Sequence, residues 1–230
     1  MNAEKHITVA GIDAVLVRKK VKNLRVTILP PDGEVRVIAP RFFPEGAIRD
    51  LLAKKADWIR KHVEQVQKRP ANAPKNYETG DPIWFFGLLY SLLIVENRKN
   101  TRVTLHDDHI TLSLKEPVPK EKREAILNEW MRERLKAEIE HYLPIWSEKT
   151  GLAPSEWTVR DMKSRWGSCN TRTKKITLNL QLVHYPTVCL EYVILHELAH
   201  LRVHGHGSEF KAILDQYMPG WKEWKAMLNA

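Results

Sequence analysis

The stretch Ile194-Leu195-His196-Glu197-Leu198-Ala199-His200 determines the fold expected for the second half of this chain. On a helix, positions i and i+4 share a face, so His196 and His200 can converge on one cation, and imidazole suits zinc. Glu197 lies about 100° further round the helix, where it can reach a metal-bound water without filling a ligand position. A general base needs to lie beside the metal-bound water in this way, because it takes a proton from that water. The other side of the helix is apolar, through Leu190, Val193, Ile194, Leu198 and Leu201. The sequence therefore predicts a zinc helix with one buried face.

A catalytic zinc site needs a third protein ligand, with the fourth position left to water. We favour His206, which follows His200 by six residues and lies between two glycines that let the backbone turn back from the helix end. His204 is the competing candidate. A downstream carboxylate, Glu209 or Glu223, is a weaker option.

Other polar residues around the zinc motif have less specific roles. Cys169 and Cys189 could add sulfur ligands, but we expect buried free thiols, because a fourth protein ligand would displace the water. We expect Asn179 to hold a strand to a loop by hydrogen bonding. His184 is expected to be a loop histidine, with oxyanion stabilisation as the alternative. Three cations are expected on a solvated face, with contact to an acidic substrate as the alternative: Arg160, Lys163 and Arg165.

The rest of the sequence indicates an α+β chain. Patterns typical of strands occur at residues 7–9, 14–17, 24–29, 34–39, 82–86, 89–95, 102–105, 109–114, 157–160 and 175–180. A helix is expected over 45–63 and a proline-containing connector over 68–75. A long amphipathic helix should begin after Pro119 and continue to about Trp146. We find no internal repeat.

These patterns predict three segments. A β-rich N-terminal lobe with one helix is expected over residues 1–76, and strands continuing that lobe over 77–118. A zincin-like catalytic lobe is expected over 119–230. In it, the long helix and a small sheet accompany the zinc helix.

The chain is basic, and the excess positive charge is concentrated near the N-terminus. Residues 1–76 carry 16 basic and 8 acidic side chains, a net charge of +8 out of +9 for the whole chain. A cluster stands out within them: Arg18, Lys19, Lys20, Lys22 and Arg25. We expect a solvated sheet face here, with weak contact to nucleic-acid phosphates as the alternative.

Composition excludes several classes of protein. With 43% hydrophobic residues, the chain is neither a polytopic membrane protein nor globally disordered. The longest nearly apolar run, residues 83–95, would span about 20 Å as a helix, which is short of a bilayer. The first residues show no signal-peptide pattern, and two cysteines indicate no disulfide framework. We therefore expect a cytoplasmic protein without a membrane partner.

The zinc motif belongs to a wider pattern. The pattern comprises Arg165-Trp166-Gly167-Ser168-Cys169, Ile176-Thr177-Leu178-Asn179, the stretch from Tyr192 to Leu201, and then His206, Phe210 and Trp221. It resembles the YgjP-like metallopeptidase family, which is similar to the SprT-like proteases and, more distantly, to small gluzincins. The resemblance covers nearly the whole chain and implies a zinc-dependent peptidase. The ligands would be His196, His200 and His206, and the base Glu197.

Two other functions stay open. His206-Gly207-Ser208-Glu209-Phe210 is closer to the SprT-like pattern, which allows a DNA-associated protease acting on DNA-bound proteins. A binding module with a structural zinc is the second alternative, but such a site is normally closed by a fourth protein ligand. In the favoured interpretation the substrate is a peptide or protein. The resemblance implies that it binds as an added strand on the sheet that includes residues 176–180.

Overall fold

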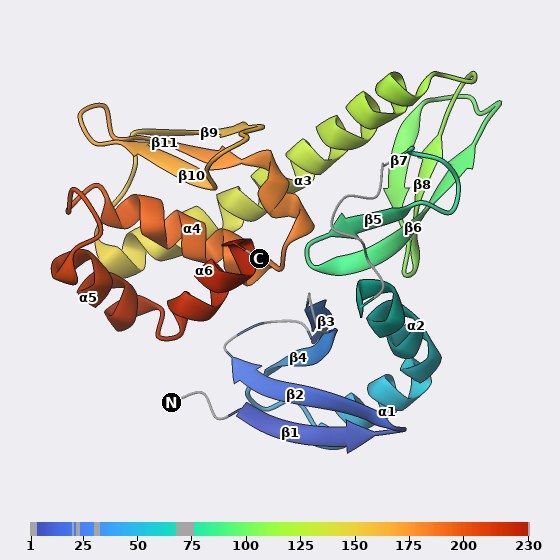
Figure 1. Ribbon diagram of the computed structural model, residues 1–230, viewed down its shortest axis with the longest axis horizontal. Coiled ribbons are helices and arrows are strands. Elements are labelled where there is room, and N and C mark those ends of the chain that lie inside the picture. The colour runs from blue at the N-terminus through green and yellow to red at the C-terminus, as the bar shows by residue number, and fades with distance from the viewer. Residues whose placement is uncertain (1–3, 20, 22–23, 30–32, 68–75, 230) are drawn as a thin grey trace. The chain divides into compact units, whose positions relative to one another are not determined.

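The computed structural model describes residues 4–19, 21, 24–29, 33–67 and 76–229. The chain forms two compact units, Met1–Pro74 and Lys75–Ala230, each of which is described by itself (Figure 1). Within the described ranges, no helix is both long and apolar enough to span a bilayer.

The N-terminal unit contains a four-stranded sheet and two helices. Its elements are β1 (Glu4–Val9), β2 (Ile12–Lys19), β3 (Arg25–Leu29), β4 (Glu34–Pro40), α1 (Glu45–Lys54) and α2 (Ala56–Gln67). The strand order is β1-β2-β4-β3, with β2 and β4 parallel and the other pairs antiparallel. Both helices contact the sheet, and Ile48, Leu52 and Ile59 on them are fully buried. The expected single helix is interrupted at Lys55, which caps α1 with φ −99° and ψ 11°.

The basic cluster of this unit is described only in part. Arg18 Nη1 donates hydrogen bonds to the carbonyl oxygens of Pro40, Arg41 and Phe43, so this guanidinium ties β2 to the end of β4. Lys20, Lys22 and the expected connector over 68–75 lie outside the described residues, as does the side chain of Arg25.

The second unit begins with another four-stranded sheet. It consists of β5 (Pro82–Phe85), β6 (Leu88–Val95), β7 (Arg102–Leu105) and β8 (His109–Ser113). The strand order is β5-β6-β8-β7, and β6 and β8 are parallel while the other pairs are antiparallel. This is the topology of the first sheet.

The two sheets are therefore structural repeats, and the expectation of no internal repeat is wrong. In each, a two-residue turn with both residues at positive φ joins the first two strands, as in a type I′ hairpin. A helix capped by proline follows each sheet. In the turns, Ala10-Gly11 corresponds to Phe86-Gly87. In the strands, Arg25-Val26-Thr27 corresponds to Arg102-Val103-Thr104, and at the helix caps Pro44 corresponds to Pro119.

The remaining elements surround the zinc-motif helix. They are α3 (Lys120–Thr150), β9 (Glu156–Arg160), β10 (Gly167–Asn170), β11 (Lys175–Asn179), the 3-10 helix η1 (Leu180–His184), α4 (Thr187–Ala199), α5 (Ser208–Tyr217) and α6 (Trp221–Asn229). The small sheet has the order β10-β11-β9, with β11 and β9 parallel and β10 antiparallel to β11. Strand β10 was not expected from the sequence. The α+β class is confirmed, and α3 and the small sheet accompany α4, as expected (Figure 1).

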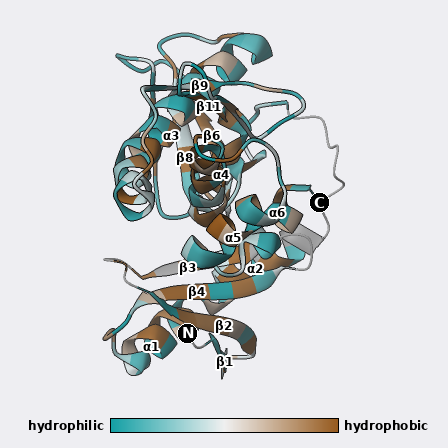
Figure 2. Ribbon diagram, turned by 90° about the vertical axis from the view of Figure 1, so that its left-hand side faces the viewer, coloured by the Kyte–Doolittle hydropathy of each residue, from teal (hydrophilic) through white to brown (hydrophobic). Residues whose placement is uncertain are grey.

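One hydrophobic core runs through the second unit. Leu92 and Leu112 of the four-stranded sheet belong to the same hydrophobic cluster as Leu135 of α3 and Leu195 of α4. Helix α4 is largely hydrophobic (Figure 2). Strand β5 contacts η1, and β7 contacts α3. Residues 77–118 therefore belong to the second unit and, contrary to the prediction from their strand patterns, do not continue the N-terminal lobe.

Candidate active site

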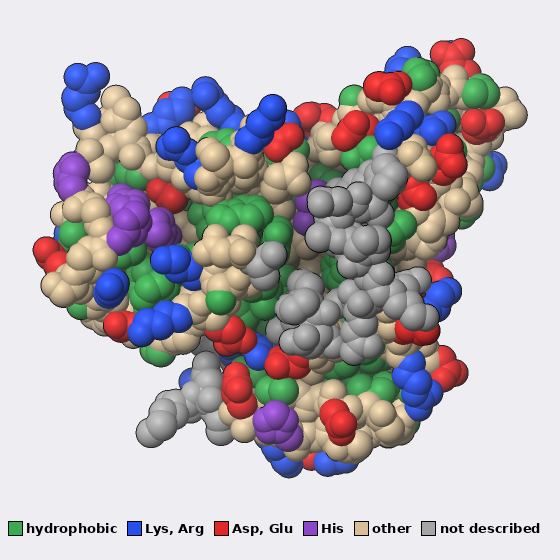
Figure 3. All heavy atoms as spheres, in the orientation of Figure 1, with side chains coloured by type: hydrophobic (Ala, Val, Ile, Leu, Met, Phe, Trp, Pro, Cys, Tyr) green, Lys and Arg blue, Asp and Glu red, His purple; other side chains and the backbone are tan. Residues whose placement is uncertain are grey.

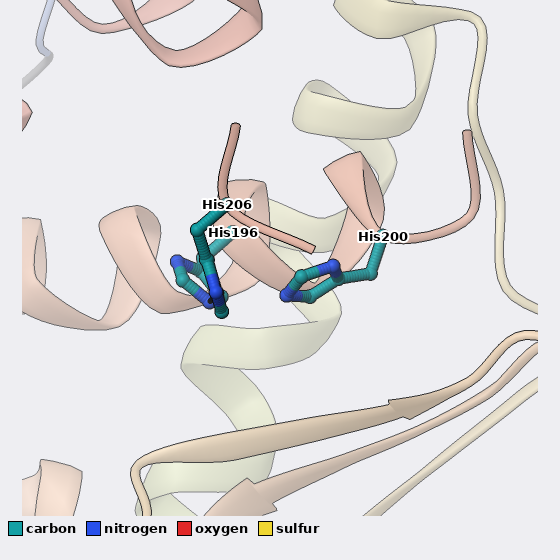
Figure 4. A group of neighbouring side chains, drawn as sticks. All are labelled: His196, His200 and His206. Atoms are coloured by element: carbon teal, nitrogen blue, oxygen red, sulfur yellow. Dashed lines mark hydrogen bonds between the residues drawn. The ribbon is translucent and has the colours of Figure 1, made fainter. Parts of the chain in front are cut away.

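Helix α4 and the loop after it bring three histidines together. His196 lies in the last turn of α4 and His200 caps its C-terminus one turn further on, while most of the helix is buried in the core. After His200 the chain leaves the helix, and Gly205, with φ +95°, turns it back so that His206 faces the helix. Figure 4 shows the three imidazole rings directed toward one another.

The nitrogen positions of the histidines fit a metal ion. One nitrogen from each ring lies within 4.8 Å of the others. Nε2 of His196 and Nε2 of His206 are 3.1 Å apart. Two nitrogens bound to tetrahedral zinc at about 2.0–2.1 Å are about 3.3–3.4 Å apart. The spacing therefore suits two ligands of one zinc ion.

In His196 and His200, the ring nitrogen Nδ1 has a contact that fixes the orientation of the ring. Nδ1 of His200 lies 3.2 Å from the carbonyl oxygen of Val203, which can only accept, so Nδ1 carries the proton and Nε2 is left for a metal. Nδ1 of His196 lies 3.4 Å from Oη of Tyr192. Such outer contacts are typical of histidine ligands of metals.

The same rings rest on an apolar surface. The ring of Phe210 lies 4.9 Å from that of His196 and 4.8 Å from those of His200 and His206. Burial, then the neighbouring His200 and His206, lower the pKa of His196 to about 3, and burial likewise lowers the pKa of His200. Both rings are therefore neutral near pH 7, as metal binding requires.

Glu197 is a buried carboxyl group next to this cluster. The residue is 4% exposed, and burial raises its pKa to about 8, while the charge of Arg165 acts in the opposite direction. A dication beside it would favour the carboxylate form. The side chain packs against the backbone of Gly167 in β10.

Asn179 holds the loop that leads into β10, in agreement with the expected role. Its Nδ2 donates to the carbonyl oxygens of Met162 and Arg165, both at 2.8 Å. Its Oδ1 accepts from the backbone N–H groups of Met162 and Gln181, both at 3.1 Å. The side chain is buried, so it connects the end of β11 to the wall of the site.

A cavity of about 700 Å³ opens over the histidines and Glu197. It is lined by residues 164–169 and 171, by the side of α4 that carries His196 and Glu197, by residues 204–206, and by Lys225, Leu228 and Asn229 of α6. Histidine side chains gather on this face of the second unit in Figure 3. The volume lies within the range of small-molecule and peptide pockets.

The other candidate residues have different positions. His204 lines the cavity, but its Nε2 lies 3.1 Å from Oγ1 of Thr171 and it is not part of the histidine cluster. Cys169 also lines the cavity outside that cluster. Cys189 is buried, with its thiol 3.6 Å from Sδ of Met227. Nδ1 of His184 lies 2.7 Å from the carbonyl oxygen of Trp84, so this residue joins η1 to β5.

Glu209 and Glu223 are exposed and do not belong to the cluster that the described residues form. Tyr192, Phe210 and Gly167 belong to the wider sequence pattern around the zinc motif, whereas nothing in the sequence singled out Lys225. Tyr192 lies one helical turn before His196, whereas the tertiary structure brings Gly167, Phe210 and Lys225 to the site.

Comparison with known proteins gives one family match. A sequence model described as the YgjP-like metallopeptidase domain matches residues 22–230. No curated protein matches the chain.

Two solved structures resemble part of the chain. The metallopeptidase zymogen abylysin of Pyrococcus abyssi is 23% identical, with a TM-score of 0.37, over 39% of this chain and 90% of that chain. The metallopeptidase zymogen jannalysin of Methanocaldococcus jannaschii is 25% identical, with a TM-score of 0.36, over 39% and 92%.

Proposed function

The chain belongs to the YgjP-like metallopeptidase family, and we propose that it is a zinc-dependent peptidase in which Glu197 is the general base. The observation that carries this proposal is the convergence of three histidine nitrogens beside one buried carboxyl group. Neutral imidazoles form a donor set that suits zinc.

His196, His200 and His206 would hold the zinc ion. When bound, zinc polarises a scissile carbonyl and lowers the pKa of water toward about 7. The carboxylate of Glu197 accepts the proton of the attacking water and delivers it to the nitrogen of the leaving amine. Glu197 is buried against β10, so its carboxylate is held in one place without needing to reorganise.

Strand β10 offers a place for the substrate backbone. Among the described strands it pairs only with β11, and its residues Gly167, Ser168 and Cys169 line the cavity. An extended peptide can add to such an edge through main-chain hydrogen bonds. We therefore place the substrate peptide between β10 and the histidines.

A purely structural zinc site is less consistent with this arrangement. Structural zinc is normally closed by four protein ligands. The cluster that the described residues form contains three, and Cys169 is not among them. The fourth position is therefore free for water or substrate.

Metal analysis combined with a peptide-library cleavage assay tests the proposal. We expect about one zinc ion per chain, hydrolysis by the wild-type protein, and loss of hydrolysis with retained zinc in Glu197→Gln. Glutamine has the same shape but cannot accept the proton, and loss of a general base costs roughly 10²–10⁴-fold in rate. Wild-type turnover in the Glu197→Gln variant would contradict the assignment of the base.

A further inference from the structure

The cavity over the histidines is positively charged. Among the described residues that line it, Arg165 and Lys225 are cationic, and Glu197 is the single carboxyl group. Ser164, Ser168 and Thr171 add hydroxyl groups that can donate hydrogen bonds. A bound dication adds two further positive charges. The site therefore favours a substrate that carries negative charge.

The two cations come from different walls of the cavity. Arg165 lies in the loop that Asn179 ties to β11, two residues before β10 begins. Lys225 lies on α6, which Trp221, Trp224 and Leu228 anchor in the core. Helix α4 contacts both β10 and α6. A peptide lying over α4 thus has a cation on either side.

Among the described residues, neither cation is in ion-pair contact with a carboxylate. Several exposed cations elsewhere form ion pairs, such as Lys5 with Glu45, Lys136 with Glu133 and Lys175 with Glu156. Within the described part of the chain, Arg165 and Lys225 form none. Lys225 instead extends its Nζ to 5.9 Å from the ring centroid of Trp221. Both cations also act on the catalytic groups through space, Arg165 on Glu197 and Lys225 on His196.

We propose that Arg165 and Lys225 are specificity-determining residues that select peptides with a carboxylate next to the scissile bond. The inference rests on the proposed peptidase function and adds the class of its substrate. The carboxylate can belong to an Asp or Glu side chain or to the C-terminus of the substrate. Both present two oxygens that accept charge-assisted hydrogen bonds from guanidinium and ammonium groups.

The test uses matched peptides and matched variants. One peptide library contains Glu and the other Gln at the positions around the cleavage site, and each is made as a free acid and as a C-terminal amide. The variants are Arg165→Gln and Lys225→Gln. The controls are Lys163→Gln and Lys222→Gln, which remove exposed cations from the same loop and the same helix but do not line the cavity.

We expect the zinc-loaded wild-type protein to cleave carboxylate-containing peptides with a higher kcat/KM than their neutral counterparts. Each variant should reduce that preference by about fivefold, the effect of a partly exposed ion pair, and the controls should leave it unchanged. High salt should weaken the preference. A preference for Glu over Gln identifies a side-chain carboxylate, whereas a preference lost on amidation identifies the C-terminus.

A binding measurement separates this inference from the proposed function. In the zinc-loaded Glu197→Gln background, fluorescence anisotropy reports the affinity for the same peptides without turnover. The wild-type protein could cleave no peptide and yet bind acidic peptides more tightly through Arg165 and Lys225. That result would contradict the peptidase function and support the carboxylate-binding site. If peptides are cleaved and bound without regard to charge, or if the controls act like the variants, the carboxylate site is overturned.

Discussion

Gly167 of β10 and Glu197 of α4 approach so closely that a Cβ atom at position 167 would overlap Oε1 of the glutamate. The same atom would lie 2.8 Å from both Cδ and Cγ. Side chains elsewhere do not tolerate such distances, so only glycine fits while the carboxylate keeps its position. The strand that would bind the substrate thus also fixes the proposed base.

Gly167→Ala should therefore displace the carboxylate and lower kcat. A misplacement of about 1 Å at a catalytic group can cost roughly 10²-fold in rate. Zinc affinity should stay near the wild-type value, because the three atoms nearest to the added methyl group all belong to Glu197 and not to a histidine. Steady-state kinetics and zinc titration measure the two effects separately.

Two comparisons show whether the effect of Gly167→Ala acts through Glu197. Gly46→Ala, in α1, adds a methyl group with no atom within 4 Å and should leave activity unchanged. In a Glu197→Ala background the clash is removed, so Gly167→Ala should cost less stability there than in the wild-type protein. Equal costs in both backgrounds would show that the two residues do not interact.

The parts of the site that could be predicted from the sequence are the local ones. His196 and His200 are related by helix periodicity alone, and His206 follows within one short turn. The long helix α3 was evident from its apolar stripe, including Leu127 and Leu135. Each of these features depends on residues that are close in the chain.

The features that were missed depend on distant partners. Strand β10 reads Gly-Ser-Cys-Asn, without strand periodicity, and it is a strand because it pairs with β11. Lys225 reaches the cavity only because α6 packs on α4. The repeat of the first two sheets lies in their pairing pattern, while few residues match beyond Arg-Val-Thr and the turn glycines. Local patterns carry none of this information.

His206→Ala should abolish tight zinc binding, whereas His204→Ala should leave it nearly intact. His206 contributes a nitrogen to the cluster, and His204 lies outside it next to Thr171. Competition with a chromogenic chelator gives the two affinities. If the two substitutions exchanged these effects, the third ligand would be His204.

Relative to Glu197→Gln, the metal-free wild-type protein should lose stability as pH rises toward 8, because only the wild type carries the buried carboxyl group. Its folded pKa of about 8 lies above the ordinary 4.5, so protonated Glu197 is favoured in the fold. The resulting stabilisation is fully present below about pH 4.5 and is lost as pH rises through the folded pKa. Glu197→Gln does not titrate and should escape this loss.

Urea unfolding of the metal-free wild-type and Glu197→Gln proteins between pH 5 and pH 8 measures the difference. Over these three pH units the free energy of unfolding of the wild type should fall relative to the variant by at most about 4 kcal/mol, at 1.36 kcal/mol per unit. Glu209→Gln, at an exposed position of α5, is the control and should show no such divergence. Parallel curves for wild type and Glu197→Gln would mean that Glu197 is already ionised in the metal-free fold.

The structural repeat provides a matched pair of glycines for the last prediction. Gly11 and Gly87 occupy the same turn position, both with φ +75°. At Gly11 an added Cβ would meet only Nη2 of Arg60 at 3.7 Å. At Gly87 it would lie 2.6 Å from Cγ of Pro186, the residue that caps α4, and the neighbouring N–H of Phe86 donates to the carbonyl oxygen of Val183 at 2.7 Å.

Alanine at either position must adopt a left-handed conformation, which costs about 1–2 kcal/mol. Gly87→Ala also forces the hairpin away from the start of the zinc helix, so it should cost several kcal/mol in all, of the order of an overpacked core. Hydrogen exchange of amides in α4 and zinc affinity should both change in Gly87→Ala. In Gly11→Ala, increased exchange should be confined to the N-terminal unit. Similar small losses in both variants, with α4 and zinc affinity unaffected, would show that the hairpin does not support the metal site.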